Sequence, residues 1–117
     1  MERVEHYRKC ICKLLTEECE KGAENTDIES QLIFDRERDR YLLLDIGWQD
    51  HERIYACFIH LDIKESKIWI QRNMTEVDIA EELVNMGIPK EDIIIGLLPP
   101  YQRPYTGYGT TGLATSA

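Results

Sequence analysis

The stretch RYLLLDIGWQDHERIYACFIHLDI, residues 40–63, decides the fold. Apolar side chains recur at every second position in residues 41–48 and again in residues 53–63, which is the period of a β-strand. The connector at residues 49–52 is short and charged, and only antiparallel neighbours can be joined so closely, because a parallel crossover needs about a dozen residues. The stretch therefore predicts a long antiparallel hairpin.

The period of two also assigns side chains to the two faces of this hairpin. In the first strand, one face receives Leu42, Leu44, Ile46 and Trp48, and the other receives Tyr41, Leu43, Asp45 and Gly47. In the second strand, one face receives Tyr55, Cys57, Ile59, Leu61 and Ile63, and the other receives Ile54, Ala56, Phe58, His60 and Asp62. Both faces are rich in apolar residues. The pattern indicates that helices cover one face while another segment or another subunit covers the second.

The sequence on either side of the hairpin predicts an α+β fold. In chain order the predicted elements are a helix (2–21), a four-stranded antiparallel meander (28–35, 41–48, 53–63, 67–72), a second helix (76–86), a short fifth strand (93–97) and an extended C-terminal arm from residue 98. The first helix shows apolar residues at steps of three and four. Thr75 is the predicted N-cap of the second helix. Three prolines predict the extended arm.

Length and composition fit a single domain of 117 residues. We assign residues 1–106 to one α+β domain and residues 107–117 to a Gly/Thr-rich tail. No apolar run approaches the roughly 20 residues that a transmembrane helix needs. The N-terminal residues lack the pattern of a secretory signal, so we expect a cytoplasmic protein without membrane contact.

The charge balance is acidic. Fourteen Lys and Arg residues stand against twenty-two Asp and Glu residues, for a net charge of −8. Nucleic-acid affinity rests largely on cations, so the balance makes direct DNA contact an unfavoured alternative. The four cysteines, Cys10, Cys12, Cys19 and Cys57, have neither metal-site nor disulfide spacing and are interpreted as small hydrophobes in a reducing compartment.

The sequence contains no recognisable catalytic, nucleotide-binding or metal-binding motif. We therefore expect a protein that is not an enzyme and that has no catalytic residue, cofactor or metal. One alternative stays open, a small enzyme built around His60 and Asp62 in one strand and Asp45 in its neighbour.

Aromatic side chains supply the candidate binding residues. Tyr101, Arg103 and Tyr105 interleave aromatic rings with a cation between prolines, and Trp69 faces away from Ile68 and Ile70. Large aromatics and arginine are favoured anchors of protein interfaces, so these four residues are the predicted partner-binding set. A direct DNA-binding module that uses the arm around Arg103 is the alternative. Trp48 is predicted to lie in the core or to be partly buried.

The order of these segments resembles the XisI family. The resemblance covers residues 1–106. It rests on the N-terminal helix and on six further segments. These are RYLLLDIGW (40–48), RIY (53–55), HLDI (60–63), KIWIQ (67–71), DIAEEL (78–83) and the C-terminal segment from Gly87-Ile88-Pro89 to Pro99-Pro100. The chain departs from the family pattern at Gly107-Tyr108-Gly109, where the resemblance implies an acidic and aromatic ending.

XisI proteins are fdxN element excision controlling factors of cyanobacteria. The resemblance therefore implies a regulator of DNA excision in heterocyst development that works with an XisH-like, nuclease-like protein and a site-specific recombinase. An acidic chain of this kind would fit a basic surface on its partner. Where both faces of the sheet are apolar, a homodimer could also cover the second face.

Overall fold

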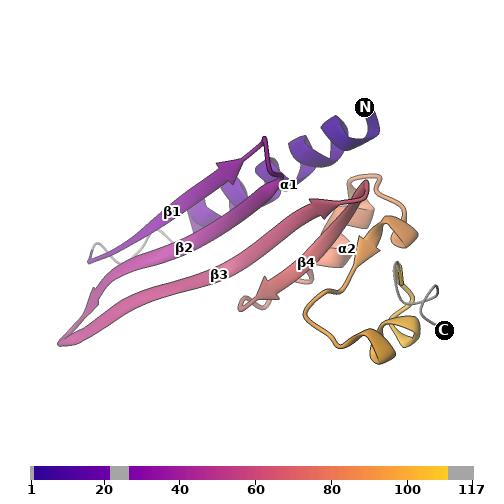
Figure 1. The fold of residues 1–117 in the computed structure, drawn as a ribbon. Helices are drawn as coiled ribbons and strands as arrows, with labels where there is room; N and C mark the ends of the chain where they lie inside the picture. Colours follow the sequence, from indigo (N-terminus) through magenta and orange to yellow (C-terminus); the bar gives the residue numbers. More distant parts are fainter. Residues whose placement is uncertain (1, 22–26, 111–117) are drawn as a thin grey trace.

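The structure, a computed structural model, describes residues 2–21 and 27–110 (Figure 1). It confirms the α+β fold with an N-terminal helix, an antiparallel meander, a second helix and a short fifth strand. In chain order the elements are α1 (Glu2–Lys21), β1 (Ile28–Asp35), β2 (Arg40–Gln49), β3 (Glu52–Lys64), β4 (Lys67–Asn73), α2 (Ile79–Asn85), the 3-10 helix η1 (Lys90–Asp92), β5 (Ile93–Ile94) and the 3-10 helix η2 (Pro100–Tyr105).

The five strands form one sheet in the order β1-β2-β3-β4-β5. The first four are antiparallel neighbours, as the short connectors predict. β5 instead runs parallel to β4, because α2 lies in the connection between them and returns the chain in the same direction. The β2–β3 hairpin is the longest part of the sheet and extends well beyond β4, which pairs only with residues 59–64 of β3 (Figure 1).

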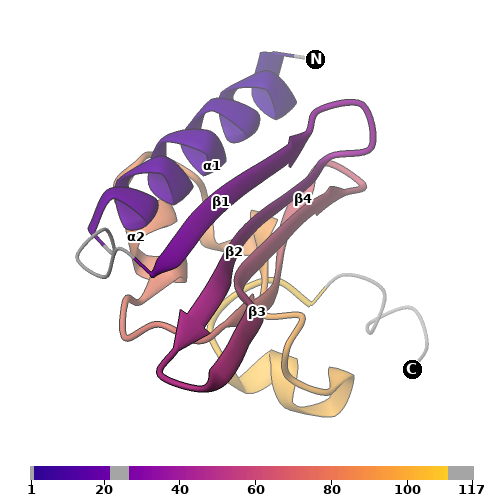
Figure 2. The same cartoon turned by 90° about the vertical axis from the view of Figure 1, so that its left-hand side faces the viewer.

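Both α-helices lie on the same side of the sheet (Figures 1 and 2). The inner stripe of α1 buries apolar side chains that recur at helical spacing, namely Val4, Tyr7, Cys10, Ile11, Leu14 and Leu15. They pack against Leu43, Ile59, Leu61 and the buried residues of α2 in one hydrophobic cluster. The core of the protein is therefore the layer between the helices and the sheet.

Two irregularities interrupt the sheet and change which side chains face the helices. Leu43 pairs with Ile59 but Leu44 pairs with Cys57, so Phe58 is an extra residue in β3. A second shift between β3 and β4 leaves Gln71 as an extra residue in β4. Each is a β-bulge, which resets the alternation of side chains along the strand.

The bulge at Phe58 corrects the predicted faces of the second hairpin strand. The sequence period placed Tyr55 and Cys57 on the same face as Ile59, Leu61 and Ile63. In the structure Ile59 and Leu61 are fully buried beneath the helices, whereas Tyr55 is 69% exposed on the opposite face. A regular period of two cannot anticipate this change, because one inserted residue inverts every assignment on one side of it.

Two further elements differ from the predictions in their detail. The second helix begins at Ile79, and its N-cap is Asp78 in place of Thr75, since the Asp78 carboxylate accepts the Glu81 backbone N–H. The C-terminal arm is extended at Pro99, but Pro100–Tyr105 forms the 3-10 helix η2.

Beyond residue 106 the chain returns to the sheet. The Gly109 N–H donates to the Ile93 carbonyl at 2.8 Å, and a Cβ at position 109 would lie 2.4 Å from the Glu91 carbonyl oxygen. Only glycine allows so close an approach. Residues 111–117 of the predicted tail lie outside the described residues.

Polar contacts join α1 to the β1–β2 turn and to η1. Arg8 forms a two-pronged ion pair with Asp39 in the β1–β2 turn, with N–O distances of 2.7 and 3.1 Å, and Tyr41 donates to the same carboxylate at 2.9 Å. Tyr7 donates its hydroxyl to the buried Asp92, which Lys67 also approaches at 3.5 Å. Burial and the Asp92 carboxylate raise the pKa of Tyr7 above its usual range.

In the parts of the chain that the structure describes, neither α-helix combines the length and apolar character that a bilayer crossing requires.

The Arg8–Asp39 contact makes the stability of the fold depend on pH. Hydrogen bonds from Arg8 and Tyr41 hold the pKa of Asp39 below its ordinary value of 3.8. A lowered carboxyl pKa stabilises the fold above the unfolded-state pKa, and this stabilisation is lost as the pH falls through the folded-state pKa. We expect Asp39→Asn to lower the free energy of unfolding by about 1–2 kcal/mol at pH 7 and by less below about pH 4.

Urea unfolding of the unmodified protein and of Asp39→Asn, from pH 7 to below about pH 4, measures the difference in free energy of unfolding. Asparagine tolerates the left-handed backbone at position 39, where φ is 57°, so the substitution adds no backbone strain. Glu37→Gln in the exposed part of the same turn is the control and should change little. A penalty for Asp39→Asn that stays constant down to low pH would contradict the assignment.

Candidate interaction surface

The structure brings two of the four predicted binding residues together. Trp69 on β4 is half-buried, and two cations lie over its ring: the Nζ of Lys64 is 4.4 Å from the ring centroid and the Cζ of Arg103 is 5.2 Å away. Arg103 is held there by its own chain, because its guanidinium donates to the carbonyls of Leu98 and Gly96 at 3.0 and 3.4 Å. Arg103 therefore attaches the C-terminal segment to the sheet.

The other two predicted residues project from η2. Tyr101 is 69% exposed and Tyr105 is 88% exposed. Such large aromatic side chains in solvent are available to a partner. Nothing in the structure tests whether a partner uses them, so the binding role of the four residues stays a prediction.

The predicted cluster of His60, Asp62 and Asp45 does not form. His60 and Asp62 contact each other at 2.8 Å, and Gln71 donates to the second oxygen of Asp62 at 3.2 Å. Asp45 lies on the opposite face of the sheet, where Ser30 donates to it at 2.7 Å beside the end of α1. Among the described residues, no group of three His, Cys, Asp or Glu side chains converges on a point that could hold a metal ion.

The cysteines of the chain are free thiols. Burial raises the pKa of each of the four thiols above its ordinary value. A raised pKa disfavours the thiolate, which is the nucleophilic form. These environments are those of small apolar side chains, as the sequence predicted.

Figures 1 and 2 show both α-helices on one side of the sheet, and on its opposite face the described residues place a set of apolar side chains that lie outside the hydrophobic core cluster. We call this opposite face the uncovered face. The strand pairing, including the bulge at Phe58, places the side chains of its members on the same side of the sheet. The members are Ile33, Leu42, Leu44, Ile46, Trp48, Tyr55 and Cys57. Ile33, Trp48 and Tyr55 are 43%, 52% and 69% exposed, and none of the seven belongs to the hydrophobic cluster or packs against it.

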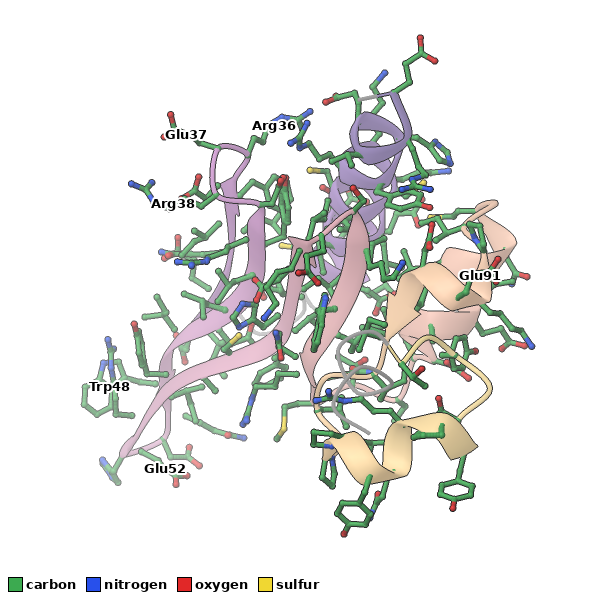
Figure 3. The ribbon with its side chains drawn as sticks, turned by 45° about the vertical axis from the view of Figure 1, so that its right-hand side comes forward. Arg36, Glu37, Arg38, Trp48, Glu52 and Glu91 are labelled. Carbon is green, nitrogen blue, oxygen red and sulfur yellow. The ribbon has the colours of Figure 1, made fainter. Side chains whose placement is uncertain are left out.

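Trp48 was predicted to be in the core or partly buried, and it is instead an exposed member of this face. Figure 3 shows its side chain at the far end of the β2–β3 hairpin, away from both helices. Arg53, its register partner on β3, lies 5.4 Å from the ring centroid. The sequence indicated that both faces of the hairpin are apolar, but the bulge decides which residues reach each face.

Together these features define a class of protein. It is a small α+β protein whose one sheet is packed against helices on one side and presents an apolar face on the other. The chain belongs to the XisI family, whose sequence profile matches residues 1–110.

Two solved structures from Anabaena variabilis show the same fold. A XisI-like protein is 48% identical to this chain, with a TM-score of 0.89, and the match covers 92% of this chain and 99% of that one. The fdxN element excision controlling factor XisI is 32% identical, with a TM-score of 0.83, covering 93% and 99% of the two chains. No curated protein sequence matches the chain.

The register of the hairpin can be tested with two neighbouring leucines. Leu43 faces the core and is 5% exposed, whereas Leu44 is on the uncovered face. We expect Leu43→Ala to lower the free energy of unfolding by about 2–5 kcal/mol, because it leaves a cavity in the core. We expect Leu44→Ala to lower it by clearly less, since Leu44 is only partly buried and lies outside the core cluster.

Chemical denaturation of Leu43→Ala, Leu44→Ala and the unmodified protein measures the two losses in free energy of unfolding. The two substitutions are identical and adjacent, so differences in strand propensity largely cancel. Equal losses of stability would mean that β2 is packed on both sides and that the face is not open.

Proposed function

We propose that this protein is a non-catalytic accessory factor that acts by binding a protein partner on the uncovered face. The observation that carries the proposal is the apolar set on that face, which lies outside the core of the chain. Contiguous apolar surface on a folded chain favours association, because its removal from water is worth about 25 cal/mol per Å². A partner surface would complete the second layer over the sheet.

The family supports a role in the control of DNA excision. One relative with this fold is an fdxN element excision controlling factor. For this chain we propose a corresponding regulatory role. The partner is an XisH-like, nuclease-like protein, as the family resemblance implies, and the complex acts with a site-specific recombinase.

The local chemistry supports a binding role over a catalytic one. The His60–Asp62 pair has no third group from Asp45, and burial raises the pKa of all four thiols, which disfavours the nucleophilic thiolate. Exposed aromatics, in contrast, are abundant on the uncovered face and on η2. Tyr101 and Tyr105, with the Trp69–Arg103 pair behind them, are proposed as a second contact region for the same partner.

A second copy of the same chain could also bind to the uncovered face and form a homodimer. A second copy would bury the same apolar residues while the partner is absent. We propose that such a dimer and the complex with the partner exclude each other, because both need the same face.

The test is co-purification of the full chain with an XisH-like protein from the same cell. Ile46 is partly exposed in the middle of the uncovered face, so Ile46→Asp would place a charge within the proposed contact. We expect this variant to fold and to bind the partner at least about 100-fold more weakly, since an unpaired charge would be buried. Titration calorimetry of the purified pair gives the affinities.

Asn85→Asp provides the control. It adds the same single charge at an exposed position at the end of α2, on the helical side of the sheet. This variant should bind like the unmodified protein. Loss of binding in Asn85→Asp but not in Ile46→Asp would place the partner on the helices and would refute the proposal.

A further inference from the structure

The uncovered face carries a local charge opposite to that of the whole chain. The chain has a net charge of −8, yet five cations lie on or beside this face, namely Arg40, Arg53, Lys64, Arg72 and Arg103. Within residues 2–21 and 27–110, none of the five is within ion-pair distance of a carboxylate, whereas Arg8, Arg36 and Arg38 each are. These five cations thus surround the apolar set without being neutralised.

The carboxylates on this face are few and mostly engaged. Asp62 is buried against His60 and Gln71. Asp35 accepts from Arg38 and from the backbone of its own turn. Glu29 in the edge strand β1 is the third carboxylate on this face. The excess of acidic residues lies elsewhere, and the segment around α2, residues 76–85, contains four acidic residues and no basic one.

Aromatic rings contact three of these cations. Three of the four cation–π contacts in the described part of the chain are on this face, and they join Arg53 to Trp48 and both Lys64 and Arg103 to Trp69. A cation over a ring keeps its charge while its side chain loses freedom. The face therefore presents an apolar centre with ordered positive charge around it.

Resting on the function proposed above, we infer that the segment docking on this face is an amphipathic helix with acidic residues beside its apolar stripe. Carboxylates at the edges of the stripe would pair with Arg40, Arg53 and Lys64. This is the reverse of the expectation from net charge, which favoured a basic partner surface. The apolar stripe would lie on Leu42, Leu44 and Ile46.

The spacing of the two elements is compatible. Side chains two residues apart on a strand recur about every 6.8 Å, and those four residues apart on a helix recur about every 6 Å. A helix on this side would also complete three layers, with the sheet between helices, which is a common arrangement of α/β structure.

A nucleic acid fits the same face less well. Leu42, Leu44 and Ile46 offer no donor or acceptor to a phosphate or a base edge. The ring of Trp69 is covered by cations on its own chain, which leaves less surface for base stacking. The long-range field of a chain with net charge −8 also repels a polyanion.

The test uses two designed helical peptides with the same apolar stripe, one with Glu and the other with Lys at the flanking positions. Fluorescence anisotropy measures their binding to the full chain at low and at physiological salt. We expect the Glu peptide to bind at least about tenfold more tightly than the Lys peptide, and the preference to shrink as salt rises. A single-stranded oligonucleotide is the third probe and should bind more weakly than the Glu peptide.

Two double variants locate the site. Arg53→Glu with Lys64→Glu should weaken binding of the Glu peptide at least about tenfold. Lys9→Glu with Lys13→Glu changes the net charge by the same amount on exposed positions of α1 and should leave the affinity within about twofold. Circular dichroism and a thermal melt confirm that each variant is folded.

Equal affinity for the two peptides, or binding of neither, would overturn the inference. So would an oligonucleotide that binds more tightly than the Glu peptide and is lost in the Arg53/Lys64 variant. The complex with the XisH-like protein separates the two proposals. If Ile46→Asp abolishes that complex while the Arg53/Lys64 reversal leaves it intact, the docking face is correct and the acidic helix is wrong. A complex that survives Ile46→Asp refutes the docking face itself.

Discussion

One extra residue in β3 decides which side chains of the β2–β3 hairpin face the helices and which face away from them. Phe58 has no partner in β2, so the side chains of β3 before and after it point to opposite sides of the sheet. Ile59 and Leu61 can then pack under α1 while Tyr55 and Cys57 turn to the other face. Without this bulge Tyr55 and Cys57 would lie on the same face as Ile59 and Leu61. The bulge divides them between the core and the uncovered face.

Under the proposed function, this division separates the residues that stabilise the fold from those that bind a partner. The helices need only one face of the sheet, and the buried contacts of Tyr7 with Asp92 and of Arg8 with Asp39 hold α1 against it. The second face contributes little to the core, so its residues are free to serve a partner. Arg103 in η2 adds a positive charge beside this face. Its guanidinium lies over the Trp69 ring, and this contact brings η2 to the edge of the sheet.

Much of the fold could be predicted from periodicity. The period of 3.6 in α1 and the period of two in the strands are local properties, and the structure confirms both helices and the meander. The bulge could not be predicted, since residues 53–63 alternate without interruption and only the pairing with β2 and β4 reveals the extra residue. The N-cap of α2 was placed three residues too early, because Thr75 and Asp78 are both good caps and tertiary packing selects between them. Trp69 and Arg103 were chosen from composition, but their contact depends on the turn of η2.

Side-chain oxidation footprinting would show whether the proposed partner occupies the uncovered face. Hydroxyl radicals label exposed aromatic and aliphatic side chains, and mass spectrometry locates the labels with and without the XisH-like protein. We expect Trp48, Tyr55 and Ile33 to be labelled in the free protein and protected in the complex, while exposed residues of α1 and α2 keep their reactivity. Unchanged labelling of Trp48 and Tyr55 in a saturated complex would contradict the proposal.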